Sequence, residues 1–133
     1  MFEIGATYHR RNDIHSEFGG NQQSGIVPSP SHPYVFLFSS PKGEEFGYLD
    51  GWVNDTDYLY SGEGQHGNQV FLRGNRAIRD HVANGRELHV FERKGAGTYV
   101  YVGEFRFISF KIVTAKDTED NSRDLIKFFL RRV

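Results

Sequence analysis

Residues 46–64, FGYLDGWVNDTDYLYSGEG, constrain the fold more than any other stretch of this sequence. Tyr48, Asp50 and Trp52 alternate, so on an extended chain their side chains share one face. A turn-forming run, Asn-Asp-Thr-Asp, separates them from a second β-like run that contains Tyr60. The pattern predicts a β-hairpin that brings Tyr48 or Trp52 near Tyr60, with Asp50 on the same side.

Such a hairpin is compatible with two different roles. Two aromatic rings and a carboxylate can hold a planar base, because the rings stack on it and the carboxylate accepts a hydrogen bond from an exocyclic amine. Aromatic pairs across a hairpin also stabilise ordinary sheets, and Asp followed by Gly is common in turns. The residues of the hairpin alone leave both roles open.

The rest of the sequence predicts mainly strands. We expect strands over residues 2–8, 34–38, 57–60, 70–72, 88–92, 98–102, 105–113 and 123–133. One helix is expected over Arg76–Asn84, where Asn75 is a suitable N-cap and Gly85 a suitable residue beyond the C-cap. With 15 Gly residues, 15% aromatic residues and this one helix signal, the chain predicts a mainly β (α+β) barrel or sandwich, formed as one domain over residues 1–133.

Composition excludes several classes of protein. The chain has no Cys, which excludes disulfides and Cys-ligated zinc and suits an intracellular protein. It has no apolar run long enough to cross a bilayer, so we expect no membrane partner. The net charge of −1 argues against a nonspecific nucleic-acid binder. Residues 1–66 hold three basic and nine acidic side chains, however, and residues 67–133 hold thirteen and eight, which makes a charge-segregated surface possible.

His9, Asp13 and His15 raise the alternative of a metal site. His9 and Asp13 could share a helical face, but the segment has no helical apolar stripe and fits no metal-binding signature. A small metal-dependent nuclease built on these three residues and Asp50 is therefore an alternative function. The reading we prefer expects no metal, no cofactor and no catalytic residue.

Three segments resemble, in their order, the landmarks of the SRA (or YDG) domain family, whose members read modified cytosine in DNA by flipping it out of the helix. They are Gly47-Tyr48-Leu49-Asp50, Tyr60-Ser61-Gly62 and Gly74-Asn75-Arg76-Ala77-Ile78. The chain looks most similar to compact bacterial SRA-like modules of modification-dependent restriction systems. This resemblance implies a PUA-like β-barrel with one or two short helices, a cytoplasmic, nucleoid-associated protein, and a possible HNH-type nuclease as a fused or separate partner.

The resemblance also implies a base pocket for 5-methylcytosine in duplex DNA, with 5-hydroxymethylcytosine as a further possible ligand. Its residues would be Tyr48, Asp50, Trp52, Tyr60, Ser61 and Gly62. Tyr48 and Tyr60 would stack on the base, with Trp52 as a third aromatic that could replace one of them. Asp50 would accept from the cytosine amino group and exclude thymine, which carries a carbonyl there. An RNA-binding PUA-like module is another alternative, because the barrel family includes RNA readers.

The expected DNA contacts lie on loops and arginines. In the family, the loop before a Gly-Ile pair enters the DNA, which here places Gln22 or Gln23 in the gap left by a flipped base. An amide can satisfy an orphaned base edge, although an ordinary polar loop fits the residues equally well. Contacts to the DNA backbone are expected from Arg10, Arg11, Arg73 and Arg76.

A second family loop, which probes the other side of the DNA in eukaryotic members, is short in this sequence. Gln65, His66 and Asn68 are therefore only weak candidates for its role, and discrimination of hemimethylated strands is in doubt.

Overall fold

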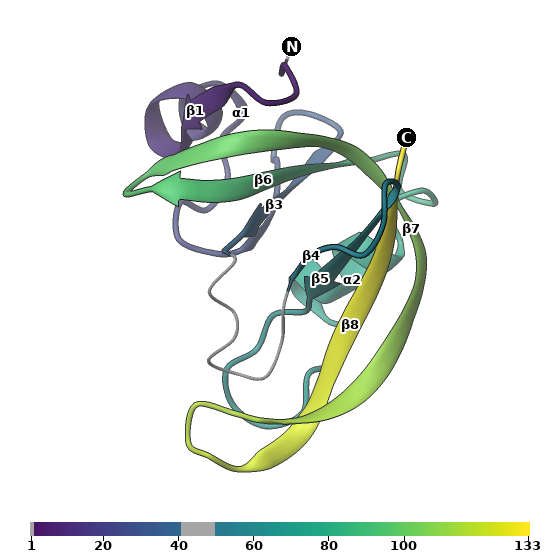
Figure 1. Cartoon of the computed structure of the whole chain (residues 1–133). Helices are drawn as coiled ribbons and strands as arrows, with labels where there is room; N and C mark the ends of the chain where they lie inside the picture. The colour runs from purple at the N-terminus through teal and green to yellow at the C-terminus, as the bar shows by residue number, and fades with distance from the viewer. Residues whose placement is uncertain (1, 41–49) are drawn as a thin grey trace.

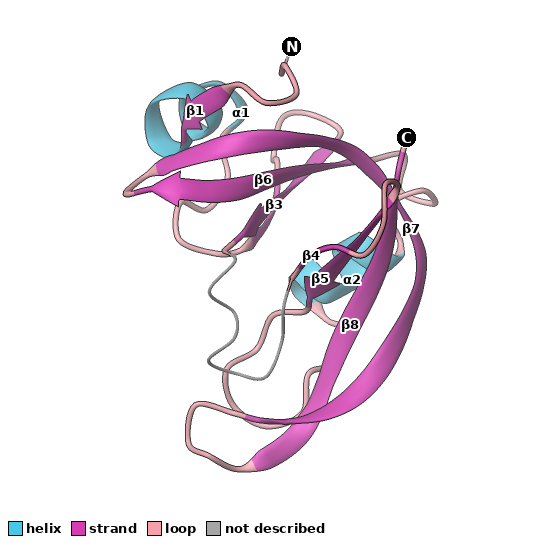
Figure 2. Cartoon of the chain, viewed as in Figure 1, coloured by secondary structure: helices cyan, strands magenta, loops and turns pink. Residues whose placement is uncertain are grey.

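The computed structural model describes residues 2–40 and 50–133, and these residues are mainly β (Figure 2). The strands are β1 (Thr7–His9), β2 (Ile26–Pro28), β3 (Tyr34–Ser39), β4 (Gly51–Trp52), β5 (Asp57–Ser61), β6 (Glu87–Gly95), β7 (Thr98–Lys116) and β8 (Ser122–Arg132). The helical segments of this part of the chain are a π-helical turn η1 (Arg10–His15) and the short α-helices α1 (Ser16–Phe18) and α2 (Arg73–Arg79). The predicted mainly β class with short helices is confirmed.

Within the described residues the eight strands form one sheet, in the order β2-β3-β6-β7-β8-β5-β4, with β1 pairing to β7 beside this path. Strands β3 and β6 run parallel, and the other pairs run antiparallel. Figure 1 shows β7 bending so that its first part lies along β6 and its last part along β8. This bend lets one continuous sheet wrap around its own core.

Strand β3 is apolar at successive positions because both of its faces are buried. Val35 and Leu37 point into the interior of the curved sheet, where they pack with residues such as Phe105 and Phe128. Phe36 and Phe38 point to the other face, into a cluster that η1 and α1 help to cover. The members of this second cluster are Ile14, Phe18, Val27, Phe36, Phe38, Phe91 and Tyr101. A continuous apolar run is what a strand between two cores requires.

Several predicted elements differ from the observed ones. The expected strand at 2–8 shortens to Thr7–His9, since Phe2 packs its ring among the aromatic residues of the second cluster. Residues 70–72 form no strand. The expected break at Gly103 is absent: β7 runs through it, with a glycine φ of 139° next to an irregularity in the β6–β7 register.

The helix is shifted relative to its prediction because of tertiary contacts. α2 begins at Arg73, so Asn75 lies inside it and is no N-cap. The Asn75 side chain is buried and bonds to another segment instead: Oδ1 accepts from Glu63 N, and Nδ2 donates to the Glu63 and Val70 carbonyls. No helix of the described residues is long and apolar enough to span a membrane.

Candidate nucleic-acid interface

Asp50 lies immediately before β4, and its carboxylate belongs to a nearly buried polar cluster. Asp50 Oδ1 accepts from the Ser61 backbone N–H at 2.9 Å, the Ser61 hydroxyl at 2.6 Å and Lys127 Nζ at 3.0 Å. Lys127 Nζ also donates to Ser61 Oγ at 2.8 Å. Within the described residues, Oδ1 accepts all three hydrogen bonds of the Asp50 side chain, so Oδ2 remains as an acceptor.

Strand pairing brings this cluster together. Ser61 on β5 is directly opposite Lys127 on β8, so the two side chains share one face of the sheet. Lys111 of β7 is opposite Lys127 on the other side. Burial lowers the pKa of Lys127 and the charge of Lys111 adds to this effect, whereas Asp50 opposes it. The result is an ion pair whose side chains are only 13% (Asp50) and 5% (Lys127) exposed.

Tyr60 points to the opposite face of the same strand. Its ring packs in the interior with Phe128, its cross-strand neighbour, and the residue is 4% exposed. Its hydroxyl lies 3.0 Å from the Gly25 carbonyl oxygen and 3.1 Å from that of Phe38, and burial raises its pKa well above the usual value. The expectation that Tyr60 and Asp50 share one side is therefore wrong, because Tyr60 and Ser61 alternate along β5. The stacking role of Tyr60 remains a prediction.

Trp52 does not approach Tyr60 as the hairpin pattern predicted. It pairs with Tyr58 across β4 and β5, and its ring lies 5.5 Å from that of Tyr58 and 5.4 Å from that of Phe105, centroid to centroid. Its position is thus towards the start of β5, away from Ser61 at the end. Tyr48, the other expected aromatic, lies outside the described residues.

Gly62 is required by the close packing of two buried amides. A Cβ at this position would lie 2.8 Å from Gln69 Oε1 and 2.9 Å from Asn75 Oδ1. Gln69 and Asn75 are 7% and 2% exposed, and both hold the chain that follows β5. The sequence analysis missed Gln69; a buried amide inside a polar, Gly-flanked run has no local signal.

Arg10 is buried beneath the loop of residues 19–25 and is no surface contact for DNA. It is 8% exposed, and its guanidinium lies 3.8 Å from the centroid of the Phe38 ring. Its Nη2 donates to the carbonyls of Asn21 at 3.1 Å and Ser24 at 2.6 Å. The expected backbone contact at Arg10 is corrected for this reason, whereas its neighbour Arg11 is exposed.

A neutral histidine completes the support of this loop. His15 Nε2 accepts from Arg10 Nε at 2.9 Å, so Nδ1 carries the proton and donates to the Gly19 carbonyl at 2.8 Å. Burial and the charge of Arg10 lower the pKa of His15. Asn21 Oδ1 accepts from the backbone N–H groups of Gln23 and Ser24. The loop backbone is thus held from both sides, while the side chains of Gln22 and Gln23 are exposed.

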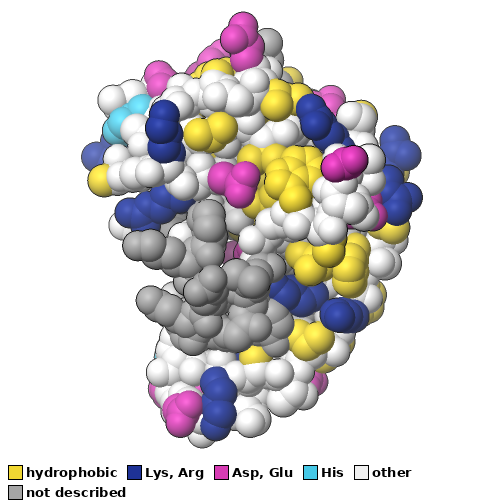
Figure 3. All heavy atoms as spheres, in the orientation of Figure 1, with side chains coloured by type: hydrophobic (Ala, Val, Ile, Leu, Met, Phe, Trp, Pro, Cys, Tyr) yellow, Lys and Arg dark blue, Asp and Glu magenta, His cyan; other side chains and the backbone are white. Residues whose placement is uncertain are grey.

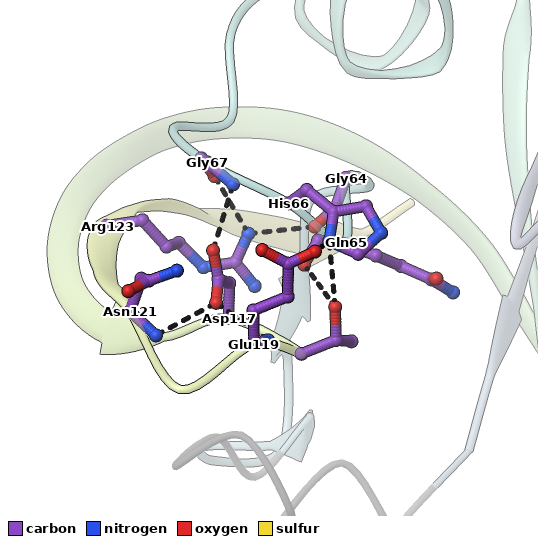
Figure 4. A network of polar contacts seen from close by, with 9 residues as sticks. Gly64, Gln65, His66, Gly67, Asp117, Glu119, Asn121 and Arg123 are labelled. Carbon is purple, nitrogen blue, oxygen red and sulfur yellow. Dashed lines mark hydrogen bonds and ion pairs between the residues drawn. The ribbon is translucent and has the colours of Figure 1, made fainter.

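The loop of residues 64–68 is held by the turn between β7 and β8 (Figure 4). Arg123 is 6% exposed and donates through Nη1 to the carbonyls of Gly64 at 2.8 Å and Gly67 at 3.2 Å. Asp117 Oδ2 accepts from Gly67 N–H at 3.1 Å, and backbone N–H donors lower the pKa of Asp117. His66, a weak candidate for a DNA contact, is exposed and lies 3.6 Å from Glu119.

A cleft of about 860 Å³ lies between these two loops and α2. It is lined by Asn21 and Ser24 of the first loop, Gly64, Gln65 and Asn68 of the second, and Arg73 and Arg76 of α2. Arg73 and Arg76 are exposed, so two of the four arginines expected to meet DNA line this cleft. Figure 3 shows that on the face of Figure 1 basic and acidic side chains are interspersed instead of gathered in one charged field.

The residues of the metal alternative bond to other groups. Asp13 Oδ2 accepts from His9 N–H, and His9 Nδ1 accepts from Asn12 N–H. Within residues 2–40 and 50–133, no three His, Asp or Glu side chains lie where they could hold a metal ion together.

The comparison with known families decides the identity of this fold. The family model described as "ScoMcrA-like, SRA domain" matches residues 4–133. The chain belongs to this SRA domain family. None of the curated proteins compared with the chain matches it.

Solved SRA structures share its architecture. The chain is 25% identical to the sulfur binding domain and SRA domain of ScoMcrA complexed with phosphorothioated DNA, with a TM-score of 0.78. The match covers 100% of this chain and 40% of the ScoMcrA chain. The Type IV phosphorothioation-dependent restriction endonuclease ScoMcrA is 25% identical, with a TM-score of 0.79, and the match covers 100% of this chain and 28% of the endonuclease chain. The SUVH5 SRA bound to fully hydroxymethylated CG DNA is 22% identical, with a TM-score of 0.70, and the match covers 99% of this chain and 89% of the SUVH5 chain. At this identity the likeness is one of fold alone. The predicted SRA membership and SRA-type, PUA-like barrel are confirmed. The present chain spans less than half of the length of each ScoMcrA chain that it matches.

Proposed function

We propose that this SRA domain reads modified cytosine in duplex DNA by flipping the base into a pocket beside Asp50. The observation that carries the proposal is the state of the Asp50 carboxylate. Three donors occupy Oδ1, and Oδ2 is left to accept from a cytosine amino group. The position is the Asp of the family's Gly-Tyr-x-Asp segment. The sulfur binding domain and SRA domain of ScoMcrA, a member of this family, form a complex with phosphorothioated DNA, which supports DNA as the partner.

The pocket is expected to read 5-methylcytosine through both its amine and its methyl group. Burying the 5-methyl group contributes on the order of 1 kcal/mol. Apolar pockets discriminate one such carbon by about 1–3 kcal/mol, so plain cytosine should bind roughly tenfold to a hundredfold more weakly. An added hydroxyl is not strongly rejected, so 5-hydroxymethylcytosine should be accepted. Tyr48 is proposed to stack on the base, whereas a stacking role for Tyr60 requires its ring to leave the interior, where it is 4% exposed and on the face of β5 opposite Asp50.

The loop of residues 19–25, η1 and α2 supply the proposed DNA contacts. Gln22 or Gln23 fills the gap left by the flipped base, because both side chains are exposed on a loop whose backbone is fixed. Arg11, Arg73 and Arg76 are exposed and meet phosphates. The domain itself acts as a reader without a catalytic residue. Since ScoMcrA is a phosphorothioation-dependent restriction endonuclease, we infer a nuclease partner, for which the HNH type remains our prediction.

A binding assay with matched duplexes tests this function. Duplexes that differ only in one base (cytosine, 5-methylcytosine or 5-hydroxymethylcytosine) are titrated by fluorescence anisotropy, with RNA of the same sequence as a competitor. A 2-aminopurine opposite the modified base reports flipping. Asp50→Ala should abolish the preference for modified cytosine. Asp57→Ala is the matched control, because Asp57 lies on the same face of β5 but pairs with Arg131 at 2.8 Å.

Two results would contradict the proposal. The first is a folded Asp50→Ala protein that binds methylated DNA as tightly as the wild type, which would make Asp50 a turn residue. The second is methyl-specific binding without a change in 2-aminopurine fluorescence, which would mean that the mark is read in the major groove. In that case the roles of Tyr48, Asp50 and Tyr60 would fall together.

A further inference from the structure

We propose that Lys127 is the positioning residue of the base pocket: it fixes the Asp50 carboxylate so that the pocket selects an amino group and rejects a carbonyl. This inference rests on the proposed function and assigns a role to a residue on β8, far in sequence from the segments that resemble the family's landmarks. Lys127 does not contact the base in this proposal. It acts through Asp50.

The burial of Lys127 is the first reason. The residue is 4% exposed, in a strand whose neighbouring residues Leu125, Ile126 and Phe128 are buried and apolar. Taking an ammonium group out of water is unfavourable by several kcal/mol unless a partner compensates it. An apolar side chain of similar length would fill the same place without this penalty. The ammonium group is therefore best explained by what it does to the carboxylate 3.0 Å away.

The direction of the hydrogen bonds is the second reason. An ammonium group can only donate, so Ser61 Oγ accepts from Lys127 and sends its own proton to Asp50 Oδ1. With the Ser61 backbone N–H, three donors converge on one carboxylate oxygen. This arrangement holds the carboxylate in one orientation and leaves the other oxygen as a pure acceptor. A base that offers an amine is matched by such an oxygen, whereas the carbonyl of thymine would face it acceptor to acceptor.

A second ion pair, between β8 and β5, differs from the Lys127–Asp50 pair in its burial. Arg131 of β8 and Asp57 of β5 are also directly opposite and lie 2.8 Å apart, yet their side chains are 54% and 23% exposed. Exposed pairs of this kind contribute little to stability. Arg131→Met therefore removes a cation from the same strand and the same face, and it provides a matched control for Lys127→Met.

The test is a double-mutant cycle read as base discrimination. Dissociation constants are measured for one duplex that carries either 5-methylcytosine or thymine at the read position, opposite guanine. Lys127→Met should lower the ratio of the two constants by about tenfold, the size expected for a charged hydrogen bond. Arg131→Met should leave the ratio unchanged, and Lys127→Arg should restore much of it. In an Asp50→Asn background, Lys127→Met should have no further effect on the ratio, because it acts through Asp50.

Several outcomes would overturn the inference. One is a folded Lys127→Met protein with the wild-type ratio; another is an equal loss of the ratio with and without Asp50→Asn. Lys127→Gln is measured alongside in case the Met variant does not fold, and an unchanged ratio in folded Lys127→Gln protein also counts against the role. A wild type that does not prefer 5-methylcytosine over thymine would instead reject the proposed function itself, so the two failures are distinguishable.

Discussion

The two loops that flank the cleft are supported in the same way but from different surroundings. Under residues 19–25, Arg10 donates to the carbonyls of Asn21 and Ser24. Under residues 64–68, Arg123 donates to the carbonyls of Gly64 and Gly67. In each case one buried guanidinium donates to two carbonyls of the loop backbone. A planar guanidinium suits this role because it presents several N–H donors in a fixed geometry.

The surroundings of the two arginines differ in charge. Arg10 is flanked by a neutral imidazole and an aromatic ring, and within the described residues its guanidinium donates to no carboxylate. Arg123 lies close enough to Asp117 for its charge to lower the pKa of that carboxyl. The first loop thus depends on a histidine that stays neutral, and the second on a carboxylate that stays ionised. A buried arginine that donates to two loop carbonyls can therefore give the two loops different responses to mutation and to pH.

The largest effect is expected from Arg10→Met. The substitution leaves the buried His15 Nε2 and two part-buried loop carbonyls without their donor, which should cost about 2–4 kcal/mol of unfolding free energy. Affinity for methylated DNA should fall as well, because the Gln22–Gln23 segment loses its fixed backbone. Thermal melting and anisotropy measure the two losses. Arg11→Met is the matched control, since the adjacent arginine is exposed; an equal loss of stability there would refute the role of Arg10.

Arg123→Met should have a smaller effect, about 1–2 kcal/mol. The Gly64 and Gly67 residues are exposed, so their carbonyls can turn to water when the guanidinium is removed. Arg123 Nε is also already buried without a partner among the described residues, which reduces what the side chain contributes. Urea denaturation of Arg123→Met and Arg10→Met under the same conditions compares the two loops. A larger loss for Arg123→Met would reverse the proposed ranking.

Local patterns predicted much of the fold. The continuous apolar run at 34–38 became β3, and the amphipathic run at 123–133 became β8, because the apolar residues of each run predict a strand with buried positions. The buried charges were not predictable in this way. Lys127 is a polar residue within an apolar run of β8, and its burial beside Ser61 and Asp50 depends on contacts between segments far apart in the sequence.

The candidate site was predicted only in part, because local patterns show motifs but not which side chains tertiary contacts bury. Asp50 was found from a short motif, whereas Arg10 was expected at the surface, since no local rule indicates that a loop will fold back over it. Asn75 fits the local rule for an N-cap, but its contacts with Glu63 and Val70 place it inside α2. Tertiary contacts overrode local preference at both residues.

Acid should loosen the first loop before the second. The pKa of His15 lies below its ordinary value of 6.5, so its contribution to stability is complete above about pH 6.5 and is lost as the pH falls through the lowered value. The pKa of Asp117 lies below 3.8, so its contribution persists to more acidic pH. Between pH 7 and about pH 5, the hydrogen-exchange protection factors of the Gln23 and Ser24 amides should therefore fall, whereas that of Gly67 should not.

Global unfolding must be separated from this local change. His81 and His89 are buried and also have lowered pKa values, so overall stability should fall in the same pH range. Amides in the ladder between β7 and β8 report that global component. If the protection factors of the Gly67 and Ser24 amides fall equally, the predicted difference in pH response between the two loops is refuted.

The smallest effect is expected from single amide substitutions at the loop tips. Gln23→Ala removes an exposed side chain that makes no hydrogen bond within the described residues, so folding stability should be unchanged. If the side chain satisfies an orphaned base edge, its loss should weaken binding of methylated duplex by about fivefold, equivalent to one hydrogen bond of roughly 1 kcal/mol. Gln65→Ala in the second loop is the matched control and should have no effect, because this loop is short and fastened to the β7–β8 turn. Anisotropy at two salt concentrations should show the same salt dependence for both variants, since neither removes a phosphate contact. Weaker binding by Gln65→Ala than by Gln23→Ala would assign the inserting role to residues 64–68 instead.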